Sequence, residues 1–166
     1  VETETVVLTF ERDIPVGKSA LNMHFTGILN DQLRGFYRSR YQDSDGQDRY
    51  LATTQFEATD ARRAFPCWDD PAVKAVFEVT LVIPEELIAI SNTPIETEWN
   101  LNDGTKAVRF GASPKMSTYL LAFIVGDLAC VEASSSSGTI IRVWATRGKE
   151  IYGQFALENS VRLLDY

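Results

Sequence analysis

The chain has 166 residues, of which 45% are hydrophobic and 23% are charged, and this composition is typical of a globular domain with its own core. The formal net charge of −7 argues against a nucleic-acid-binding surface, because such surfaces depend on contacts from Lys and Arg to phosphates. No stretch is long and apolar enough to span a membrane, and the first residues do not resemble a signal peptide, so we expect no nucleic-acid and no membrane partner.

Alternation of apolar and polar residues predicts strands in the first part of the chain. The predicted strands cover residues 5–10, 19–26, 35–41 and 50–57. The polar run 42–48 reads as a hairpin loop, with its turn at Asp45-Gly46.

The middle and end of the chain continue the pattern and then change period. A short helical pattern at 60–64 is stopped by Pro66, which cannot donate the next helical hydrogen bond. Further strands are predicted at 73–83, 87–91, 95–99, 106–111, 119–125 and 139–145. The run 119–125 is apolar on both faces and is expected to be buried, whereas the serine-rich run 134–138 is expected to be a solvated connector.

Residues 150–166 form the last predicted element. Leu157, Val161 and Leu164 follow one another at spacings of four and three, which predicts an amphipathic helix. No glycine or proline near Tyr166 signals an end, so we expect this helix to continue past the sequence. Together these patterns predict an all-β, mostly antiparallel fold with one C-terminal helix.

Cysteine usage favours a reducing compartment. Cys67 and Cys130 are the only cysteines, and a domain of this size seldom needs a disulfide framework. The sequence also lacks an N-x-S/T glycosylation sequon. We therefore predict a cytoplasmic location.

The segment 53–71 carries the candidate site. Gln55 and Glu57 lie two residues apart at the end of a predicted strand, so both side chains are expected on the same side. A carboxylate beside a carboxamide can hold a cationic hydrogen-bond donor such as an α-amine, although polar residues at strand ends are more often simply solvated. The pairs Arg62-Arg63 and Asp69-Asp70 are expected to be structural, with an arginine satisfying carbonyls and carboxylates where the loop folds back.

The sequence lacks the residue patterns of a catalytic zinc site and of a catalytic nucleophile. His24 is the only histidine, so the chain cannot supply the two histidines of an H-E-x-x-H zinc site, and His24, Cys67 and Cys130 have no metal-ligand spacing. There is no G-x-S-x-G nucleophile motif, and Cys67 reads as a small buried hydrophobe. We therefore expect no catalytic residue and no metal ligand in this chain.

The segment T-Q-F-E-A-T-D-A-R-R-A-F-P-C-W-D-D-P resembles a stretch of zinc aminopeptidases of the aminopeptidase N and puromycin-sensitive type. The sequence departs from that pattern at Trp68 and Asp70, outside the Gln/Glu pair. Similarity extends to F-T-G-I-L-N-D, G-F-Y-R-S-R-Y and S-P-K-M-S-T-Y-L-L-A-F-I-V-G, and so covers essentially the whole chain. The match is closest to the cytosolic fungal branch of the family.

The resemblance implies a domain organisation and a function. Residues 1–146 would be the β-sandwich-like or saddle-like N-terminal domain, truncated at its front, and 147–166 the start of a helix leading into a catalytic domain. Zinc would be the cofactor of the full-length parent, with its ligands after Tyr166, and this chain alone would be inactive. The domain would cap the catalytic domain of the same chain and bind the N-terminus of a peptide substrate. Gln55 would help to form the pocket for the first side chain, and Glu57 would bind the free α-amine.

Two other function classes remain open. The chain could belong to a non-catalytic relative, such as the transcription-factor subunit that shares this architecture, in which the domain is a protein-interaction scaffold. It could also be an independent β-sandwich binding module, which the unfinished helix argues against. An H-E-x-x-H motif downstream would identify the enzyme.

Overall fold

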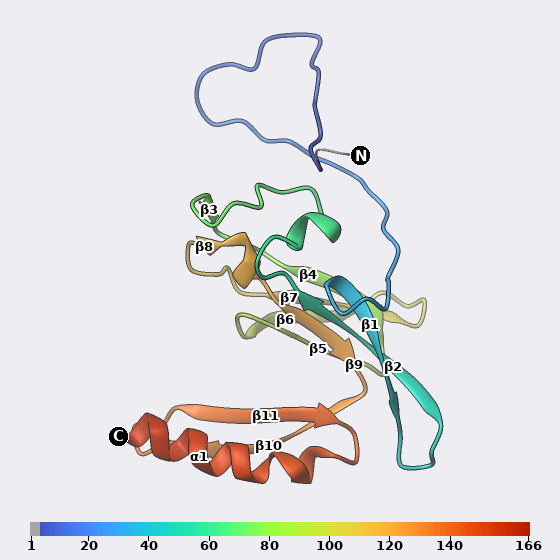
Figure 1. Cartoon of the computed structure of the whole chain (residues 1–166), viewed down its shortest axis with the longest axis vertical. Coiled ribbons are helices and arrows are strands. Elements are labelled where there is room, and N and C mark those ends of the chain that lie inside the picture. The colour runs from blue at the N-terminus through green and yellow to red at the C-terminus, as the bar shows by residue number, and fades with distance from the viewer. Residues whose placement is uncertain (1–3) are drawn as a thin grey trace.

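The computed structural model describes residues 4–166, which form a larger body of β-sheets and a smaller hairpin–helix unit (Figure 1). Every strand pair in the named sheets is antiparallel, and one α-helix lies near the C-terminus. The predicted all-β, mostly antiparallel fold with a C-terminal helix is therefore confirmed. No helix in residues 4–166 has the length and apolar character needed to cross a membrane.

The body contains three sheets. A four-stranded sheet has the order β1-β2-β9-β5, and its strands are β1 (Gly35–Gln42), β2 (Asp48–Gln55), β9 (Phe123–Gly126) and β5 (Ile88–Ser91). A three-stranded sheet has the order β4-β7-β6, made of β4 (Thr80–Pro84), β7 (Thr105–Phe110) and β6 (Ile95–Asn100). A short pair joins β3 (Lys74–Ala75) to β8 (Met116–Ser117).

The remaining elements are short helical turns and the hairpin–helix unit. One-turn 3₁₀ helices occupy η1 (Ala61–Arg63), η2 (Thr118–Leu120) and η3 (Glu150–Gly153). The unit pairs β10 (Leu128–Ser134) with β11 (Ile140–Thr146) and packs α1 (Gln154–Asp165) on that hairpin.

The β1–β2 hairpin follows the predicted turn closely. Its register runs from Gly35 opposite Gln55 to Gln42 opposite Asp48. In the loop, the Asp43 carboxylate accepts hydrogen bonds from the backbone N–H groups of Asp45 and Gln47, at 3.0 and 2.9 Å. Gly46 has a φ of +75°, a conformation that glycine adopts without steric penalty.

Two apolar clusters hold the body together. One packs Ile83, Ala89, Val108 and Phe110 from β4, β5 and β7. The other joins the residues at the end of β2 to the loop that follows, through Phe56, Ala61 and Leu121. Each of these residues is at most 6% exposed, so this second cluster fixes the tip of β2 in the body.

The predicted strands at 5–10 and 19–26 are wrong. Residues 4–29 form neither helix nor strand and run as an arch outside the sheets (Figure 1). The alternating apolar side chains are exposed, from 43% at Met23 to 74% at Val6. Alternation marks a chain that can pleat, but a strand forms only where a neighbouring backbone accepts its hydrogen bonds, and no strand of the described chain pairs with this segment.

Two later predictions also need correction. The single strand predicted at 73–83 is two strands, because its partner backbone is irregular beyond Phe110 and the Phe77 N–H donates to the Ser113 hydroxyl instead. In the run 119–125, only residues from Phe123 onward are strand, and Leu120 is 47% exposed because it lies in η2. The short helical pattern predicted at 60–64 is confirmed, as the 3₁₀ helix η1.

The sequence pattern also missed β10. Because β10 pairs with β11, the serine-rich run between them is the turn of a hairpin. In this turn the buried Ser135 hydroxyl accepts a hydrogen bond from the Thr139 backbone N–H at 3.0 Å. The expected fully solvated connector is therefore wrong for Ser135.

Gly126 at the end of β9 offers a test of how tightly the four-stranded sheet is packed. A Cβ atom there would lie 2.9 Å from the Cβ of Leu51 on β2, closer than packed carbon atoms tolerate. Gly126→Ala should therefore lower the free energy of unfolding by about 1–3 kcal/mol, as measured by urea denaturation. Gly111→Ala is the matched control, because its nearest atom would be 3.9 Å away, and a change within about 0.5 kcal/mol is expected. Equal effects of the two substitutions would contradict the packing of β2 on β9.

Candidate functional site

Gln55 and Glu57 flank a buried residue at the tip of β2. Gln55 is the last residue of the strand, and Glu57 lies in the turn that follows, so the strand predicted to reach residue 57 ends two residues earlier. Both side chains are exposed, whereas Phe56 between them is only 2% exposed. The peptide bond from Glu57 to Ala58 is cis.

Phe56 anchors this tip through aromatic contacts. Its ring meets Phe65 edge-to-face at a centroid distance of 5.9 Å and Phe123 at 6.1 Å. Phe123 in turn packs edge-to-face on Phe36 at 5.0 Å. Such pairs add about 0.5–1.5 kcal/mol each beyond the burial of their area, so side chains from β1, β9 and the following loop all restrain Phe56.

The chain then turns sharply back toward β1. The Asp60 N–H donates to the Phe56 carbonyl at 2.9 Å, and η1 begins at the fully buried Ala61. Gly35 at the start of β1 lies against this turn, and a Cβ atom there would be 2.9 Å from the Cβ of Arg63. Gly35 also has a φ of +70°, so both its conformation and its close contact favour glycine.

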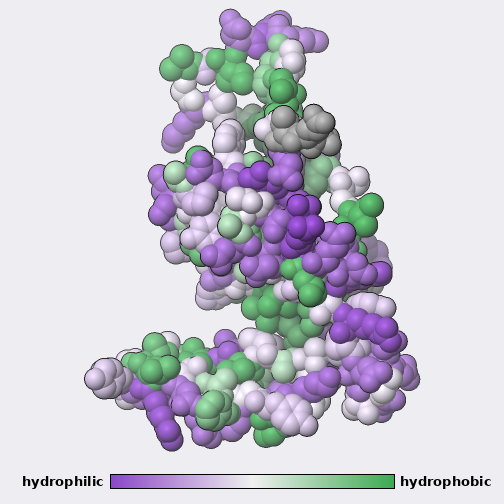
Figure 2. All heavy atoms as spheres, in the orientation of Figure 1, coloured by the Kyte–Doolittle hydropathy of each residue, from purple (hydrophilic) through white to green (hydrophobic). Residues whose placement is uncertain are grey.

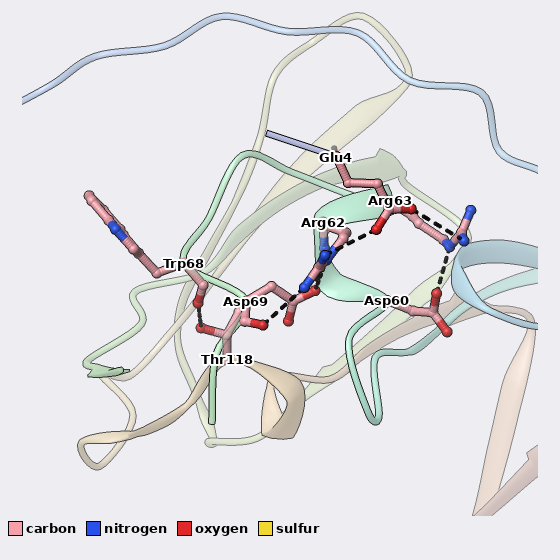
Figure 3. A network of polar contacts seen from close by, with 7 residues as sticks. All are labelled: Glu4, Asp60, Arg62, Arg63, Trp68, Asp69 and Thr118. Atoms are coloured by element: carbon pink, nitrogen blue, oxygen red, sulfur yellow. Dashed lines mark hydrogen bonds and ion pairs between the residues drawn. The ribbon is translucent and has the colours of Figure 1, made fainter. Parts of the chain in front are cut away.

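Arg62 and Asp69 close the loop after η1 (Figure 3). The Asp69 carboxylate accepts hydrogen bonds from the backbone N–H and the Nε–H of Arg62, at 3.1 and 3.0 Å, while Arg62 Nη2 donates to the Asp69 carbonyl at 3.2 Å. The Asp69 side chain is 3% exposed, so its charge depends on these donors. The structural role predicted for the arginine and aspartate pairs is confirmed for Arg62 and Asp69.

More exposed ion pairs surround the interaction between Arg62 and Asp69, which we call the Arg62–Asp69 clamp. Arg63 Nε donates to the Asp60 carboxylate, and Glu4 places one oxygen 3.0 Å from Arg62 Nη1 and the other 3.9 Å from Arg63 Nη2 (Figure 3). Partly exposed pairs of this kind contribute little to stability. Their effect is to bring the start of the described chain back onto the loop.

Two side-chain hydroxyl groups donate hydrogen bonds to backbone carbonyls of this loop. Thr118 Oγ1 donates to the Trp68 carbonyl at 3.0 Å (Figure 3), and Ser117 Oγ donates to the Pro71 carbonyl at 2.7 Å. Thr118 and Ser117 are 4% and 5% exposed. Sequence reasoning missed both residues, because their acceptors are backbone carbonyls far away in the chain and no local pattern marks such a contact.

A polar hollow of about 530 Å³ lies beside this loop. It is lined by Glu4, Thr5, Thr59, Arg62, Cys67, Trp68, Asp69, Asp70 and Pro71. A second, apolar hollow of about 420 Å³ is lined by Phe25 and by residues of β1, β2, β4, β9 and the loop after η1. Neither hollow is lined by Gln55 or Glu57, and both of these side chains are exposed.

The described residues do not fit a zinc site. No group of three or more His, Cys, Asp or Glu side chains within 4–166 is arranged to hold a metal ion. Both cysteines are free thiols and half-buried. Burial raises the pKa of the Cys67 thiol to about 11, and the nearby Asp69 carboxylate acts in the same direction. At neutral pH this group is therefore a protonated thiol and a poor nucleophile or ligand.

The Arg62–Asp69 clamp predicts a stability effect. Asp69→Ala removes the acceptor of two Arg62 donors inside the loop and should lower Tm by roughly 3–10 °C in a thermal melt. Asp70→Ala is the control, because the exposed Asp70 carboxylate accepts only a local bond from the Ala72 N–H, and its Tm should stay within about 2 °C. A clamp without structural importance would give the same melt for both variants.

The raised pKa of Cys67 predicts a pH profile. Because the thiolate is the reactive form, alkylation of Cys67 by iodoacetamide should be slow at neutral pH and should accelerate up to about pH 11. In the urea-unfolded chain the profile should shift to the ordinary thiol pKa of about 8.5. Peptide mass spectrometry reports the site, and identical profiles in the folded and unfolded protein would contradict the burial of this thiol.

Comparison with known proteins identifies relatives that are much longer than this chain. The chain is 51% identical over 164 residues to Aminopeptidase M1-B of Oryza sativa subsp. japonica, a match that covers 99% of this chain and 18% of the relative. It is 50% identical over 159 residues to the Alanine/arginine aminopeptidase of Saccharomyces cerevisiae, covering 95% and 18%. Puromycin-sensitive aminopeptidase of Caenorhabditis elegans matches at 49% over 150 residues, covering 90% and 16%.

These relatives are aminopeptidases, and the chain spans less than a fifth of the length of each. A family model described as the Peptidase M1 N-terminal domain matches residues 1–120, which include the loop closed by Arg62 and Asp69 and both Gln55 and Glu57. The chain therefore belongs to the family of Peptidase M1 N-terminal domains.

Proposed function

We propose that this chain is the substrate-anchoring and capping part of a zinc-dependent aminopeptidase, which removes N-terminal residues from peptides. The observation that supports this most is the family match across residues 1–120, which holds an exposed glutamine and an exposed glutamate at a rigid strand tip. The zinc would be held by residues outside this chain, since the described residues do not fit it. The metal would supply the hydrolytic chemistry, and this chain alone would be inactive.

Glu57 would bind the free α-amine of the substrate. An exopeptidase must distinguish a charged chain terminus from an internal peptide bond, and a carboxylate pairs with an ammonium group through charge-assisted hydrogen bonds. Burial of Phe56 on one side of Glu57 fixes the backbone from which this carboxylate projects. A fixed anchor for the amine also fixes the distance to the first peptide bond, which favours reaction there.

Gln55 would help to form the pocket for the first side chain of the substrate. It lies one residue before Phe56, is exposed and pairs with Gly35 at the start of β1. A carboxamide can both donate and accept hydrogen bonds, so it would adjust to different first residues without binding the amine itself.

A covering domain would strengthen the anchor. At a separation of about 4 Å, the attraction between an ammonium and a carboxylate is about 1 kcal/mol in water but about 4 kcal/mol at a partly desolvated protein surface. Glu57 is exposed in this chain, so a catalytic domain of the same parent protein that closes over the tip of β2 would supply the lower dielectric.

The two free cysteines support a cytosolic location. One relative at 48% identity is named "Aminopeptidase 2, mitochondrial" in Saccharomyces cerevisiae, so the names of relatives do not point to a single compartment. The cytosol remains our proposal.

The amine anchor is tested in the full-length protein. Glu57→Ala should lower kcat/KM for free-amine substrates by roughly ten- to a hundredfold, because a charge-assisted contact in the transition state is lost. The zinc content and the thermal melt should be unchanged, since Glu57 contributes neither a metal ligand nor a core contact. The loss should be much smaller for a substrate whose α-amine is blocked. Gln55→Ala should change the preference among first residues more than the overall rate.

Glu85→Ala is the matched control, because Glu85 is also an exposed turn glutamate of the body but follows β4 in the three-stranded sheet. Its kcat/KM should match that of the wild type. Wild-type turnover of free-amine substrates by Glu57→Ala, at equal zinc content, would refute the anchor and leave Glu57 as a solvated residue.

A further inference from the structure

The loop before β1 brings an arginine to the same end of the sheet as Gln55 and Glu57. Arg34 directly precedes Gly35, and Gly35 is the register partner of Gln55. Paired residues of an antiparallel sheet have Cα atoms about 4.5–5.5 Å apart, and consecutive Cα atoms are about 3.8 Å apart. The Cα atom of Arg34 therefore lies within about 10 Å of that of Gln55.

The turn that carries Glu57 folds back against the same point. The Asp60 N–H donates to the Phe56 carbonyl at 2.9 Å, so the chain from Phe56 to Asp60 forms a closed turn. A Cβ atom on Gly35 would lie 3.5 Å from the Asp60 carbonyl oxygen at the end of that turn. Arg34 is therefore the chain neighbour of the residue against which the Glu57 turn rests.

The backbone on both sides of Arg34 has an unusual conformation. Leu33 and Gly35 have φ values of +60° and +70°, and this left-handed region is uncommon for leucine. The Asn30 carbonyl ties the loop to β1, because it accepts a hydrogen bond from the Arg38 N–H at 2.7 Å. The fold therefore sets the point at which the Arg34 side chain leaves the backbone.

Arg34 differs from the other arginines of this region because no carboxylate neutralises it. Arg40 and Arg49 of the β1–β2 hairpin form ion pairs with aspartates, and the Arg38 guanidinium lies 5.3 Å from the centre of the Tyr50 ring. Arg34 is exposed and forms no ion pair with any carboxylate of residues 4–166. Figure 2 shows mostly hydrophilic residues over the start of β1 and η1, so charge and hydrogen bonding govern recognition here.

Glu57 is also without an ion pair in the described part of the chain. This end of the sheet thus carries an exposed carboxylate and an exposed guanidinium that do not neutralise each other. An amine anchor made of a carboxylate alone repels a substrate whose first side chain is also a carboxylate, because like charges at close range repel. A guanidinium at the same place offsets that repulsion.

We propose that Arg34 is a specificity-determining residue, which binds the side-chain carboxylate of a peptide substrate that begins with aspartate or glutamate. This rests on the proposed function, in which Glu57 binds the α-amine and Gln55 borders the pocket for the first side chain. A planar guanidinium binds a carboxylate through two parallel N–H···O hydrogen bonds. An acidic first residue then meets a group of opposite charge at its amine and another at its side chain.

Glutamyl and glutaminyl arylamide reporters test this role in the full-length protein. The two side chains have nearly the same shape and differ in charge, and an arylamide has no C-terminal carboxylate that could bind Arg34 instead. Arg34→Gln should lower the ratio of kcat/KM for the glutamyl reporter to that for the glutaminyl reporter by roughly tenfold or more, because a charge-assisted contact is lost. Arg34→Lys keeps the charge without the planar fork and should give an intermediate ratio.

Arg38→Gln is the matched control, because it removes the same charge from the adjoining strand. Arg38 lies three residues from Gly35, and successive strand residues alternate between faces, so it lies on the face of the sheet opposite to Gln55. Its ratio should equal that of the wild type. A loss of stability alone would lower turnover of both reporters in parallel, so the ratio separates a binding role from a structural one.

The outcomes separate the role of Arg34 from the proposed function. An unchanged ratio in Arg34→Gln, with both reporters cleaved, overturns the role of Arg34 and leaves the aminopeptidase assignment intact. An equal fall of the ratio in Arg38→Gln also overturns it, because the effect would then come from the net charge of the domain. A wild type that cleaves only the glutaminyl reporter overturns it as well. A zinc-loaded wild type that cleaves neither reporter refutes the proposed function, and the role of Arg34 falls with it.

Discussion

Burial of Phe56 is the constraint on which the rest of the site depends. This ring is 2% exposed and contacts aromatic rings from the following loop and from β9, so the end of β2 cannot move without disturbing three elements. Gln55 and Glu57 are exposed because they flank it in the chain. The apolar core thereby determines where two polar side chains leave the surface, although neither of them contacts that core.

The loop after Phe56 is held by polar contacts in place of regular structure. Only three residues of it are helical, yet Asp69 is almost fully buried because Arg62 supplies both a side-chain and a backbone donor. Thr118 and Ser117 satisfy carbonyls on the other side of the loop. An irregular loop keeps one conformation when its buried polar groups are paired in this way, and the backbone of Glu57 at its start is restrained as a result.

The sequence predicted correctly those features that depend on contacts between residues close together in the chain. The Asp45-Gly46 turn indicated the β1–β2 hairpin, and the charge pattern around Arg62 and Asp69 indicated how the loop folds back. The pattern failed where a strand needs a partner from far away: residues 5–10 and 19–26 alternate but pair with no strand of the described chain. It failed again at β10, where small and polar residues in L-A-C-V-E-A-S hide the strand, and only pairing with β11 defines it.

The exposure of Glu57 is the feature that the chemistry of an amine anchor does not favour. A carboxylate attracts an ammonium group only weakly in bulk water, because the solvent screens the two charges. Burial of Phe56 restrains the backbone beside Glu57, but it leaves the carboxylate itself in water. The two requirements of the proposed anchor therefore have different sources, since its position comes from the core of this chain and its strength would depend on the removal of water from the tip of β2.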